Sequence, residues 1–368
     1  MKRKIILHVS QPTHGGVIEY IRLFLENSST EQFKNLLICP LNTSKIIGNF
    51  NSPVININMV REISPIKDLV VIMKLRREIK RVKPDVLYLH SAKAGALGRI
   101  ASFGLKHKIV YNPHGWSFTI DCSQIKKRMY AFVEKFLSVK SDLIINISDD
   151  EFLKAKEAGL NHSKMTIINN GIDVYKYKKN TKLIYSERIV IGFVGRLDQQ
   201  KNPVILIEIA KKLIHTYPNV LFYIVGDGAL REELETNIFN EGLSKYFYFT
   251  GWVDNVESEI RNFDLALLTS KWEGFGLVVC EYMAAKKPVV SVEVGGVKNI
   301  ITNNIDGILI KNYDVDAFVE SITSLLEDKT FYKYIVNNAY KTVKSKYSIK
   351  TTIEASEKQL KKLMELER

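Results

Sequence analysis

The sequence predicts an α/β protein made of two doubly wound, parallel-sheet domains. Short runs of β-branched and other apolar residues alternate with longer segments of helical periodicity, which is typical of parallel strands joined by crossover helices. The 368 residues exceed what one ordinary hydrophobic core holds, so two domains of roughly 170 to 190 residues are expected. A polar, lysine-rich segment, Asp173 to Glu187, separates the two series and is expected to contain the linker.

Seven runs in the first half and six in the second have the length and composition of buried parallel strands. In the first half they are Ile5–Ser10, Asn35–Cys39, Val54–Ile57, Val86–His90, Lys108–Asn112, Leu143–Ser148 and Met165–Asn169. In the second half they are Arg188–Gly195, Val220–Gly226, Tyr246–Gly251, Leu265–Thr269, Pro288–Val292 and Gly307–Ile310. We therefore expect an N-terminal domain at 1–175, a linker at 176–187 and a C-terminal domain at 188–345. Residues 346–368 are expected to form a charged amphipathic helix that returns to the first domain.

Composition narrows the class of protein. Apolar residues make up 46% of the chain and charged residues 25%, which is normal for a soluble globular protein. The three cysteines are far apart and show no metal-binding spacing, which favours a reducing compartment and argues against structural zinc. The apolar run after the basic N-terminus is too short for a signal peptide, and no segment has about 18 consecutive apolar residues. A cytoplasmic location, possibly at the inner face of the cell membrane, is therefore expected.

The net charge of +13 requires an explanation. No nucleic-acid-binding motif is present, so a nucleic-acid partner is not expected. Two basic segments, Met73–Lys83 and Ser123–Lys140, lie in the first half. The second carries apolar residues at helical spacing: Ile125, Met129, Phe132, Val133, Phe136 and Leu137. That helix could pack on the core with a solvated basic face, or it could contact an anionic membrane surface peripherally.

In the first half, two loops at predicted strand ends could bind a ligand. Gly15 and Gly16 enter a helix after the first strand, but without the G-x-G-x-x-G fingerprint, so their amides could meet an anion or form a plain turn. His114 stands between Pro113 and Gly115 after another strand. Its imidazole could donate to a substrate hydroxyl or a developing charge, or could simply be a hydrogen-bonded loop residue. His90 is interpreted as structural.

The second half opens with a cationic loop. Arg196 follows Gly195 at a predicted strand end, and Lys201 comes five residues later. Two fixed cations there could neutralise a diphosphate leaving group. The alternative is a loop with ordinary solvated cations. No Walker A motif is present, which excludes a P-loop nucleotidase.

Two carboxylates bracket the most informative loop. Glu273 precedes Gly274 and Gly276, and Glu281 lies beyond them in a predicted helix, Val278–Ala285. The glycines allow a ligand to approach the backbone, and free N–H groups at a helix start suit a phosphate or a polar sugar. The loop could instead be scaffold with both acids solvated.

Together these residues resemble the retaining glycosyltransferases of family 4, which have the GT-B fold: two Rossmann-like domains facing one another across a cleft. In the second half the resemblance rests on Val194-Gly195-Arg196-Leu197, Lys201, Val225-Gly226-Asp227-Gly228, Thr250-Gly251-Trp252, the segment Glu273 to Ala285, and Gly295-Gly296. In the first half it rests on Gly15-Gly16, His114-Gly115 and Asn170-Gly171-Ile172-Asp173. The first domain of such enzymes binds the acceptor, and the second binds the nucleotide sugar.

The resemblance implies roles for individual residues. Arg196 and Lys201 would bind the diphosphate, Glu273 the transferred sugar and Glu281 the ribose. The backbone of Gly274, Phe275, Gly276 and Leu277 would steady the sugar and phosphates, with Gly195, Gly226 and Gly251 in the same nucleotide-binding region. Gly15 and Gly16 would reach the diphosphate from the first domain. His114 would lie near the anomeric carbon and count among the catalytic residues with Glu273, Arg196 and Lys201.

The resemblance also implies a reaction. A hexosyltransferase-type enzyme would move sugar from a nucleotide donor, UDP more than GDP, to a hydroxyl acceptor, expected to be a lipid-linked glycan in bacterial surface polysaccharide assembly. No metal or other cofactor is expected, and Ser148-Asp149-Asp150-Glu151 is interpreted as a helix N-cap. Lys286-Lys287 and Asn299 depart from the family's usual glycine and glutamate, which leaves the donor less certain. The alternatives are a GT-B-fold nucleotide-sugar 2-epimerase and a non-catalytic glycosyltransferase partner.

Overall fold

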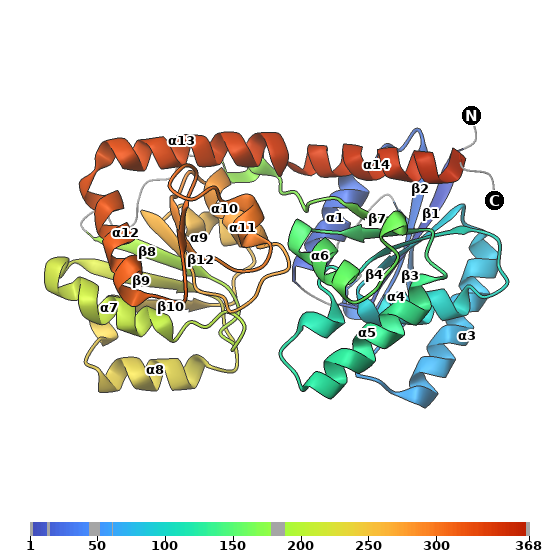
Figure 1. Ribbon diagram of the computed structural model, residues 1–368, viewed down its shortest axis with the longest axis horizontal. Helices are drawn as coiled ribbons and strands as arrows, with labels where there is room; N and C mark the ends of the chain where they lie inside the picture. Colours follow the sequence, from blue (N-terminus) through green and yellow to red (C-terminus); the bar gives the residue numbers. More distant parts are fainter. Residues whose placement is uncertain (1–2, 13–14, 44–51, 61, 178–187, 366–368) are drawn as a thin grey trace. The chain divides into compact units, whose positions relative to one another are not determined.

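A computed structural model describes residues 3–12, 15–43, 52–60, 62–177 and 188–365 (Figure 1). The chain divides into two compact units: unit 1 comprises residues 1–170 and 349–368, and unit 2 comprises residues 171–348. Most of the expected linker, 178–187, lies outside the described residues. No helix in the described ranges is long and apolar enough to cross a membrane.

Unit 1 is built on a seven-stranded, fully parallel sheet with the strand order β3-β2-β1-β4-β5-β6-β7. Its strands are β1 Lys4–Ser10, β2 Phe33–Cys39, β3 Val54–Asn56, β4 Val86–His90, β5 Lys108–Asn112, β6 Leu143–Asn146 and β7 Met165–Ile167. The order reverses between β1 and β4, so the loops that follow these two strands flank the position where open α/β sheets bind ligands.

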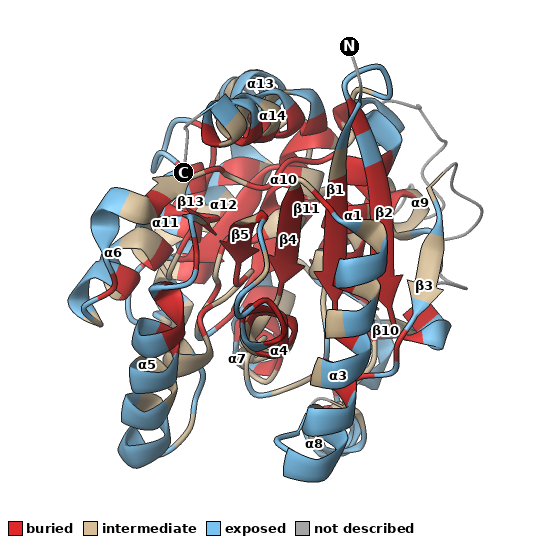
Figure 2. Cartoon of the chain, turned by 90° about the vertical axis from the view of Figure 1, so that its right-hand side faces the viewer, coloured by how far each residue is buried: buried red, intermediate tan, exposed pale blue. Residues whose placement is uncertain are grey.

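Helices cover both faces of this sheet. They are α1 Gly16–Asn27, α3 Pro65–Val82, α4 Ala92–Ala101, α5 Gln124–Ser138, α6 Asp149–Glu157 and α14 Ile349–Glu365, with the 3₁₀ turns η1 Ser117–Thr119 and η2 His162–Lys164. One core layer joins the sheet to α1 and α14, which also pack against each other. The other joins it to α3 and α4. In Figure 2 the central strands are buried, while much of α3 and α5 is exposed.

Unit 2 contains a six-stranded parallel sheet with the order β10-β9-β8-β11-β12-β13. Its strands are β8 Ile189–Val194, β9 Val220–Val225, β10 Phe247–Gly251, β11 Leu265–Leu268, β12 Val289–Val292 and β13 Ile308–Ile310. Its helices are α7 Ile205–Thr216, α8 Arg231–Asn240, α9 Val256–Ile260, α10 Leu277–Ala284, α11 Val297–Ile300, α12 Val315–Glu327 and α13 Lys329–Lys346, with the 3₁₀ turns η3 Val174–Tyr177 and η4 Ser244–Tyr246. Here the order reverses between β8 and β11.

All thirteen predicted strands occur; seven end at the predicted residue and six end one or two residues earlier. The shift has one cause at several ends: the polar or glycine residue after the strand belongs to the loop, as with Thr269 after β11 and Gly226 after β9. The Ser148 cap is also confirmed, because its hydroxyl accepts a hydrogen bond from the Glu151 N–H at 3.2 Å. The predicted α/β fold class is correct.

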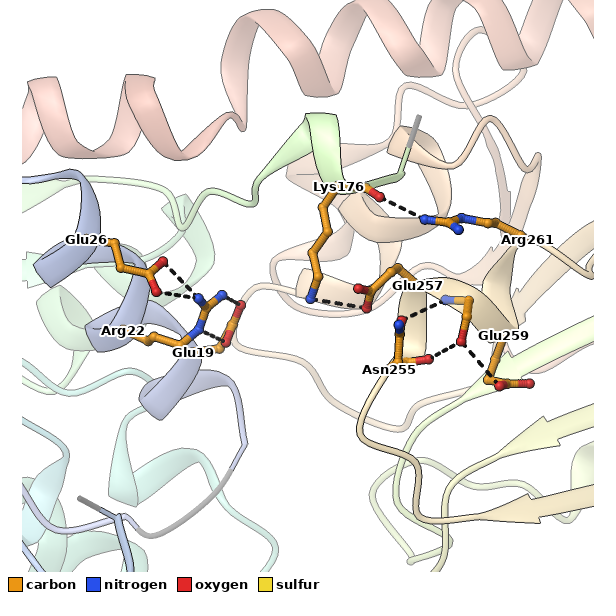
Figure 3. A network of polar contacts seen from close by, with 9 residues as sticks. Glu19, Arg22, Glu26, Lys176, Asn255, Glu257, Glu259 and Arg261 are labelled. Carbon is orange, nitrogen blue, oxygen red and sulfur yellow. Dashed lines mark hydrogen bonds and ion pairs between the residues drawn. The ribbon is translucent and has the colours of Figure 1, made fainter. Parts of the chain in front are cut away.

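Surface ion pairs brace elements within each unit (Figure 3). In unit 1, Arg22 of α1 lies between Glu19 and Glu26, one turn away on either side, at 2.5 and 2.7 Å. In unit 2, the Lys176 ammonium pairs with Glu257 of α9 at 3.1 Å, and Arg261 donates to the Lys176 carbonyl at 3.0 Å. These contacts fasten η3 to the body of unit 2.

The exposure of α5 contradicts one of the two interpretations of its sequence. Ile125 is 82% exposed and Phe132 70% exposed, and Met129, Val133 and Phe136 are exposed as well. Of the six apolar residues that suggested a core-packing helix, only Leu137 is buried. The interpretation of α5 as a helix that packs its apolar stripe on the core is therefore wrong.

Candidate active site

The cationic loop after β8 and the glutamate loop after β11 meet at the strand-order reversal of unit 2. The Lys201 ammonium lies 2.5 Å from Glu273 Oε1. Ser270 also donates its hydroxyl to Glu273 Oε1, at 2.6 Å. Glu273 is only 9% exposed, so this carboxylate is buried with two donors. The structure thus brings together two residues that the sequence placed 72 positions apart.

The backbones of the two loops are also joined. Lys271 donates its N–H to the Gln200 carbonyl at 2.7 Å, and the Gln200 side-chain amide donates to the Trp272 carbonyl at 3.1 Å. Thr269 donates its hydroxyl to the Lys201 carbonyl at 2.8 Å. These bonds hold the loop that carries Lys201 beside the loop that carries Glu273.

Arg196 lies on the same loop as Lys201 but has different partners. Its guanidinium pairs with Asp198 at 3.2 Å and donates to Gln200 Oε1 at 2.9 Å. The side chain is about half exposed, whereas Lys201 is largely covered. Arg196 is therefore placed as the outer cation of the loop, free of a buried ion pair.

Two glycines allow neighbouring loops to support this site at very short range. A Cβ on Gly226 would lie 2.0 Å from the carbonyl oxygen of Gly195, and Gly226 donates its N–H to Gly251. A Cβ on Gly295 would lie 1.9 Å from the Glu273 carbonyl oxygen. Any side chain at either position would displace the backbone of a predicted ligand-binding loop.

The glutamate loop ends at the start of α10. Gly276 is the N-cap, with φ of 100°, and no side chain caps the helix, which begins at Leu277. Phe275 is buried edge-on against Tyr347, with ring centroids 5.6 Å apart, and this contact anchors the loop in the core of unit 2. Glu281 is the fifth residue of α10 and is half-buried. The loop and helix start leave Gly274 and Leu277 partly accessible beside Glu273.

Of the residues that depart from the family pattern, Lys286 has φ of 57°, a left-handed conformation that glycine adopts more easily. The Lys287 ammonium donates to the Arg261 carbonyl at 2.9 Å. Arg261 belongs to neither the cationic loop nor the glutamate loop. Asn299 lies on α11, and its carbonyl accepts from the Tyr347 hydroxyl at 2.9 Å.

In unit 1, the predicted residues lie near the reversal between β1 and β4. Gly15 is the N-cap of α1, and Gly16 its first residue, with no side-chain cap; the preceding Thr13 and His14 lie outside the described residues. His114 Nε2 lies 3.0 Å from His90 Nδ1, and the His114 N–H donates to Asn112 Oδ1 at 3.1 Å. Burial lowers the pKa of His114 to about 3, so its imidazole is neutral at neutral pH.

The sequence assigned no supporting role to Ser270 or Gln200 in unit 2, or to His90 as the partner of His114 in unit 1. Ser270 alone carried a local signal, since it stands three residues before Glu273 in the same loop. Across the described residues, no three His, Cys, Asp or Glu side chains are grouped so that they could hold a metal ion. The expectation that no metal is needed stays a prediction.

The fold and these paired loops are those of a GT-B protein. A family model described as "Glycosyl transferases group 1" matches residues 175–342, and one described as "Glycosyltransferase Family 4" matches residues 38–176. The chain is 30% identical over 345 residues to the UDP-Gal:alpha-D-GlcNAc-diphosphoundecaprenol alpha-1,3-galactosyltransferase of Escherichia coli, covering 88% of each chain.

A second relative and a solved structure point to the same family and fold. The chain is 27% identical over 379 residues to the capsular polysaccharide biosynthesis glycosyltransferase CapM of Staphylococcus aureus, with 95% of this chain and 94% of CapM covered. Its fold matches the crystal structure of Anabaena HepE in complex with UDP-glucose with a TM-score of 0.85 at 22% identity, covering 97% and 99% of the two chains. This chain belongs to glycosyltransferase family 4 and is a glycosyltransferase, which confirms the family, fold and enzyme class predicted from the sequence.

Proposed function

We propose that this enzyme transfers a sugar from a UDP-sugar, with retention of the α configuration, to a hydroxyl of a lipid-linked glycan during assembly of a bacterial surface polysaccharide. The printed activity of the E. coli relative, which uses UDP-Gal and a diphosphoundecaprenol-linked acceptor, supports the donor and acceptor classes. The HepE complexes with UDP and UDP-glucose support UDP as the nucleotide. The CapM relative supports the polysaccharide context.

The observation that carries this proposal is the buried Lys201–Glu273 ion pair at the strand-order reversal of unit 2. Without donor, the Glu273 carboxylate neutralises the ammonium, so neither buried charge is left alone. A bound diphosphate supplies the ammonium with a second anion, and Glu273 can then accept hydrogen bonds from sugar hydroxyls. The pair is thus set for a ligand that carries both a phosphate and a polyol.

The leaving group determines the chemistry that these residues perform. As the bond between the anomeric carbon and the UDP oxygen breaks, negative charge develops on the β-phosphate. Lys201, the outer cation Arg196 and the uncapped N-terminus of α10 stabilise that charge. The departing phosphate oxygen accepts the proton of the attacking hydroxyl on the same face of the sugar, which preserves the configuration.

The remaining site residues complete the proposal. Glu281 holds the ribose hydroxyls, and the backbone from Gly274 to Leu277 steadies the sugar and phosphates. Gly16 contributes its amide to the diphosphate, and His114 contacts the sugar. No metal is required in this scheme, because the fixed cations and the helix start stabilise the diphosphate.

A lipid-linked acceptor places the enzyme at the inner face of the cell membrane, and α5 suits that location. Its exposed apolar side chains, of which Ile125 and Phe132 are the most exposed among those named above, lie close in sequence to Lys126, Lys127 and Arg128. A helix with exposed apolar side chains and adjacent cations binds anionic lipid surfaces peripherally. We propose that α5 makes this contact.

Replacing Lys201 by methionine tests the donor site. We expect UDP to stop raising the thermal unfolding temperature of the protein, and kcat/KM for the UDP-sugar to fall by roughly 10² or more, because one fixed charge on the leaving group is lost. Calorimetric titration with UDP and transfer from UDP-galactose and UDP-glucose to a lipid-linked acceptor would measure these effects.

Lys212→Met is the matched control, because Lys212 is an exposed lysine of α7 that pairs with Asp316. This variant should bind UDP and turn over like the unmodified enzyme. Unchanged UDP affinity and turnover in Lys201→Met would contradict the assignment of the diphosphate site.

A further inference from the structure

A diagonal line of polar side chains crosses the sheet of unit 1. On neighbouring strands, His8 of β1 is in register with Leu37 of β2, two residues beyond Asn35. On the other side, His8 is in register with Tyr88 of β4, two residues before His90. Residues in register, and residues two apart along a strand, point to the same face of a sheet. Asn35, His8 and His90 therefore share one face.

The line ends at the carboxyl edge of the sheet. His90 is in register with Asn112, the last residue of β5, and His114 follows two residues later. Each step from Asn35 to His114 thus moves one strand across and two residues toward the edge where ligands bind in open α/β sheets. This face is the one covered by α1 and α14.

Hydrogen-bond distances join all four side chains. His8 Nε2 lies 3.2 Å from Asn35 Oδ1, His8 Nδ1 lies 3.0 Å from His90 Nε2, and His90 Nδ1 lies 3.0 Å from His114 Nε2. The remaining nitrogen, His114 Nδ1, is buried and has no hydrogen-bond partner among the residues that the structure describes. This series of hydrogen bonds thus begins at the Asn35 oxygen and ends at a buried His114 nitrogen whose lone pair or proton is unsatisfied.

All three imidazoles are neutral. Burial lowers the pKa of His8 to about 4 and the pKa of His114 to about 3. Burial also lowers the pKa of His90 well below its ordinary value, and the neighbouring His114 and His8 lower it further. Aromatic rings surround the chain: Tyr20 of α1 lies edge-on to His114 with ring centroids 4.7 Å apart.

Neutrality determines every proton position, because a neutral imidazole has one donor and one acceptor nitrogen. The Asn35 oxygen can only accept, so His8 carries its proton on Nε2 and accepts through Nδ1. His90 must then donate from Nε2 and accept through Nδ1, and His114 must donate from Nε2. The outer nitrogen, His114 Nδ1, is left with a lone pair.

We propose that Asn35, His8 and His90 are positioning residues that fix the tautomer of His114, so that His114 Nδ1 accepts a hydrogen bond from a hydroxyl of the bound sugar. This rests on the proposed function, in which His114 contacts the sugar. His114 would then accept a hydrogen bond from the sugar, whereas the sequence suggested that its imidazole could donate one. A lone pair at this nitrogen repels phosphate and carbonyl oxygens and selects an O–H group. His114, strained at φ of 52°, is held for that contact.

Nitrogen NMR of the full-length, ¹⁵N-histidine-labelled protein near pH 7 tests the tautomer directly. His114→Gln, His90→Gln and His8→Gln assign the signals among the seven histidines. We expect His8, His90 and His114 each to carry the proton on Nε2, with an unprotonated Nδ1 on His114. A proton on His114 Nδ1 would overturn the proposal. This measurement needs no turnover, so a failure to transfer sugar from UDP donors would count against the proposed function alone.

Asn35→Leu removes the inner acceptor while keeping the side-chain size. We expect His114 to populate both tautomers and kcat to fall by about tenfold, the effect of one lost hydrogen bond, with UDP affinity unchanged. His107→Gln is the control, because His107 is buried in the same unit but bonds to Ser102. It should leave the His114 tautomer and kcat unchanged. An unaltered His114 tautomer in Asn35→Leu would refute the proposal that Asn35, His8 and His90 fix this tautomer, whatever happens to kcat.

Discussion

At the scale of single residues, the buried charges of this enzyme are held by partners that lie far away in the sequence. Lys201 and Glu273 neutralise each other across the loops after β8 and β11. Arg99, which is fully buried, bonds to Glu134 at 2.7 Å and lies over the Tyr111 ring. Leaving either member of such a pair without the other would bury an uncompensated charge, which is strongly destabilising. Activity and stability therefore depend on pairs rather than on single residues.

Glu151 is a buried acid beside the His114 loop, and it makes stability depend on pH. Burial raises its pKa to about 8, and its side chain accepts a long hydrogen bond from the Ile147 N–H. An ordinary glutamate in the unfolded chain ionises near pH 4.5. Between about pH 4.5 and 8 the unfolded chain releases this proton while the folded protein keeps it, so the contribution of Glu151 to stability falls as pH rises.

Glu151→Gln should therefore become more stable relative to the unmodified enzyme as pH increases. We expect the gain in free energy of unfolding to grow by a few kcal/mol between pH 5 and pH 8, since one pKa unit corresponds to about 1.4 kcal/mol. Urea unfolding of both proteins at matched pH values measures it. Glu157→Gln, an exposed change on the same helix, is the control. A stability difference that does not change with pH would contradict a protonated Glu151.

The positions of the site residues could be predicted, but their pairing could not. Arg196, Lys201 and Glu273 stand directly after strands, and strand ends of parallel sheets form the ligand edge. That Lys201 meets Glu273 depends on β8 being next to β11, which strand spacing alone does not establish. The hydrogen-bonded series from Asn35 to His114 depends on the register of four strands, and no local pattern in the sequence encodes register.

At the scale of elements, α5 shows how periodicity can mislead. Its apolar residues recur at helical spacing, yet the buried face of α5 carries Glu134. The Glu134 carboxylate accepts hydrogen bonds from Arg99 and from the Tyr111 hydroxyl. Satisfying a buried arginine takes precedence over burying one apolar stripe, since an unpaired buried guanidinium costs more than the transfer of a few side chains. The apolar stripe is consequently exposed.

Replacing Ile125, Phe132 and Phe136 of α5 by serine should abolish most binding to anionic vesicles. Each exposed side chain that enters a bilayer contributes roughly 1 kcal/mol or more, so we expect the affinity for phosphatidylglycerol-containing vesicles to fall by more than tenfold. Vesicle co-sedimentation measures it. The fold should persist, because all three side chains are exposed in unit 1.

The basic residues of α5 allow a second test of its contact with membranes. Neutralising Lys126, Lys127 and Arg128 should weaken vesicle binding by about 1 kcal/mol per residue and reduce its salt dependence. Changing Lys358, Lys361 and Lys362 of α14 to glutamine removes the same charge from another helix of unit 1 and should have little effect. Vesicle binding that survives both sets of α5 changes would rule out α5 as the membrane contact.

At the scale of the whole molecule, both units place their predicted ligand loops at a reversal of strand order, between β1 and β4 in one and between β8 and β11 in the other. The sequence predicted the strands well because buried parallel strands are short apolar runs with polar ends. The last helix was expected to return to the first domain, but the helix that it packs against there was not predicted, because an amphipathic stripe identifies a buried face without identifying its partner. In the structure, α14 follows unit 2 in the chain but packs on α1 in unit 1.

Unit 1 should therefore lose stability when α14 is altered, although unit 2 precedes α14 directly. Leu360 is fully buried in the core layer shared with α1, and Leu360→Ala should destabilise unit 1 by about 2–5 kcal/mol through a cavity. Hydrogen exchange followed by mass spectrometry should show faster exchange in β1, β2 and β4, with β8 to β13 unchanged. Lys361→Ala, an exposed neighbour, is the control. Equal acceleration in both units would show that α14 does not belong to unit 1 alone, because the cavity would then have loosened a core that the two units share.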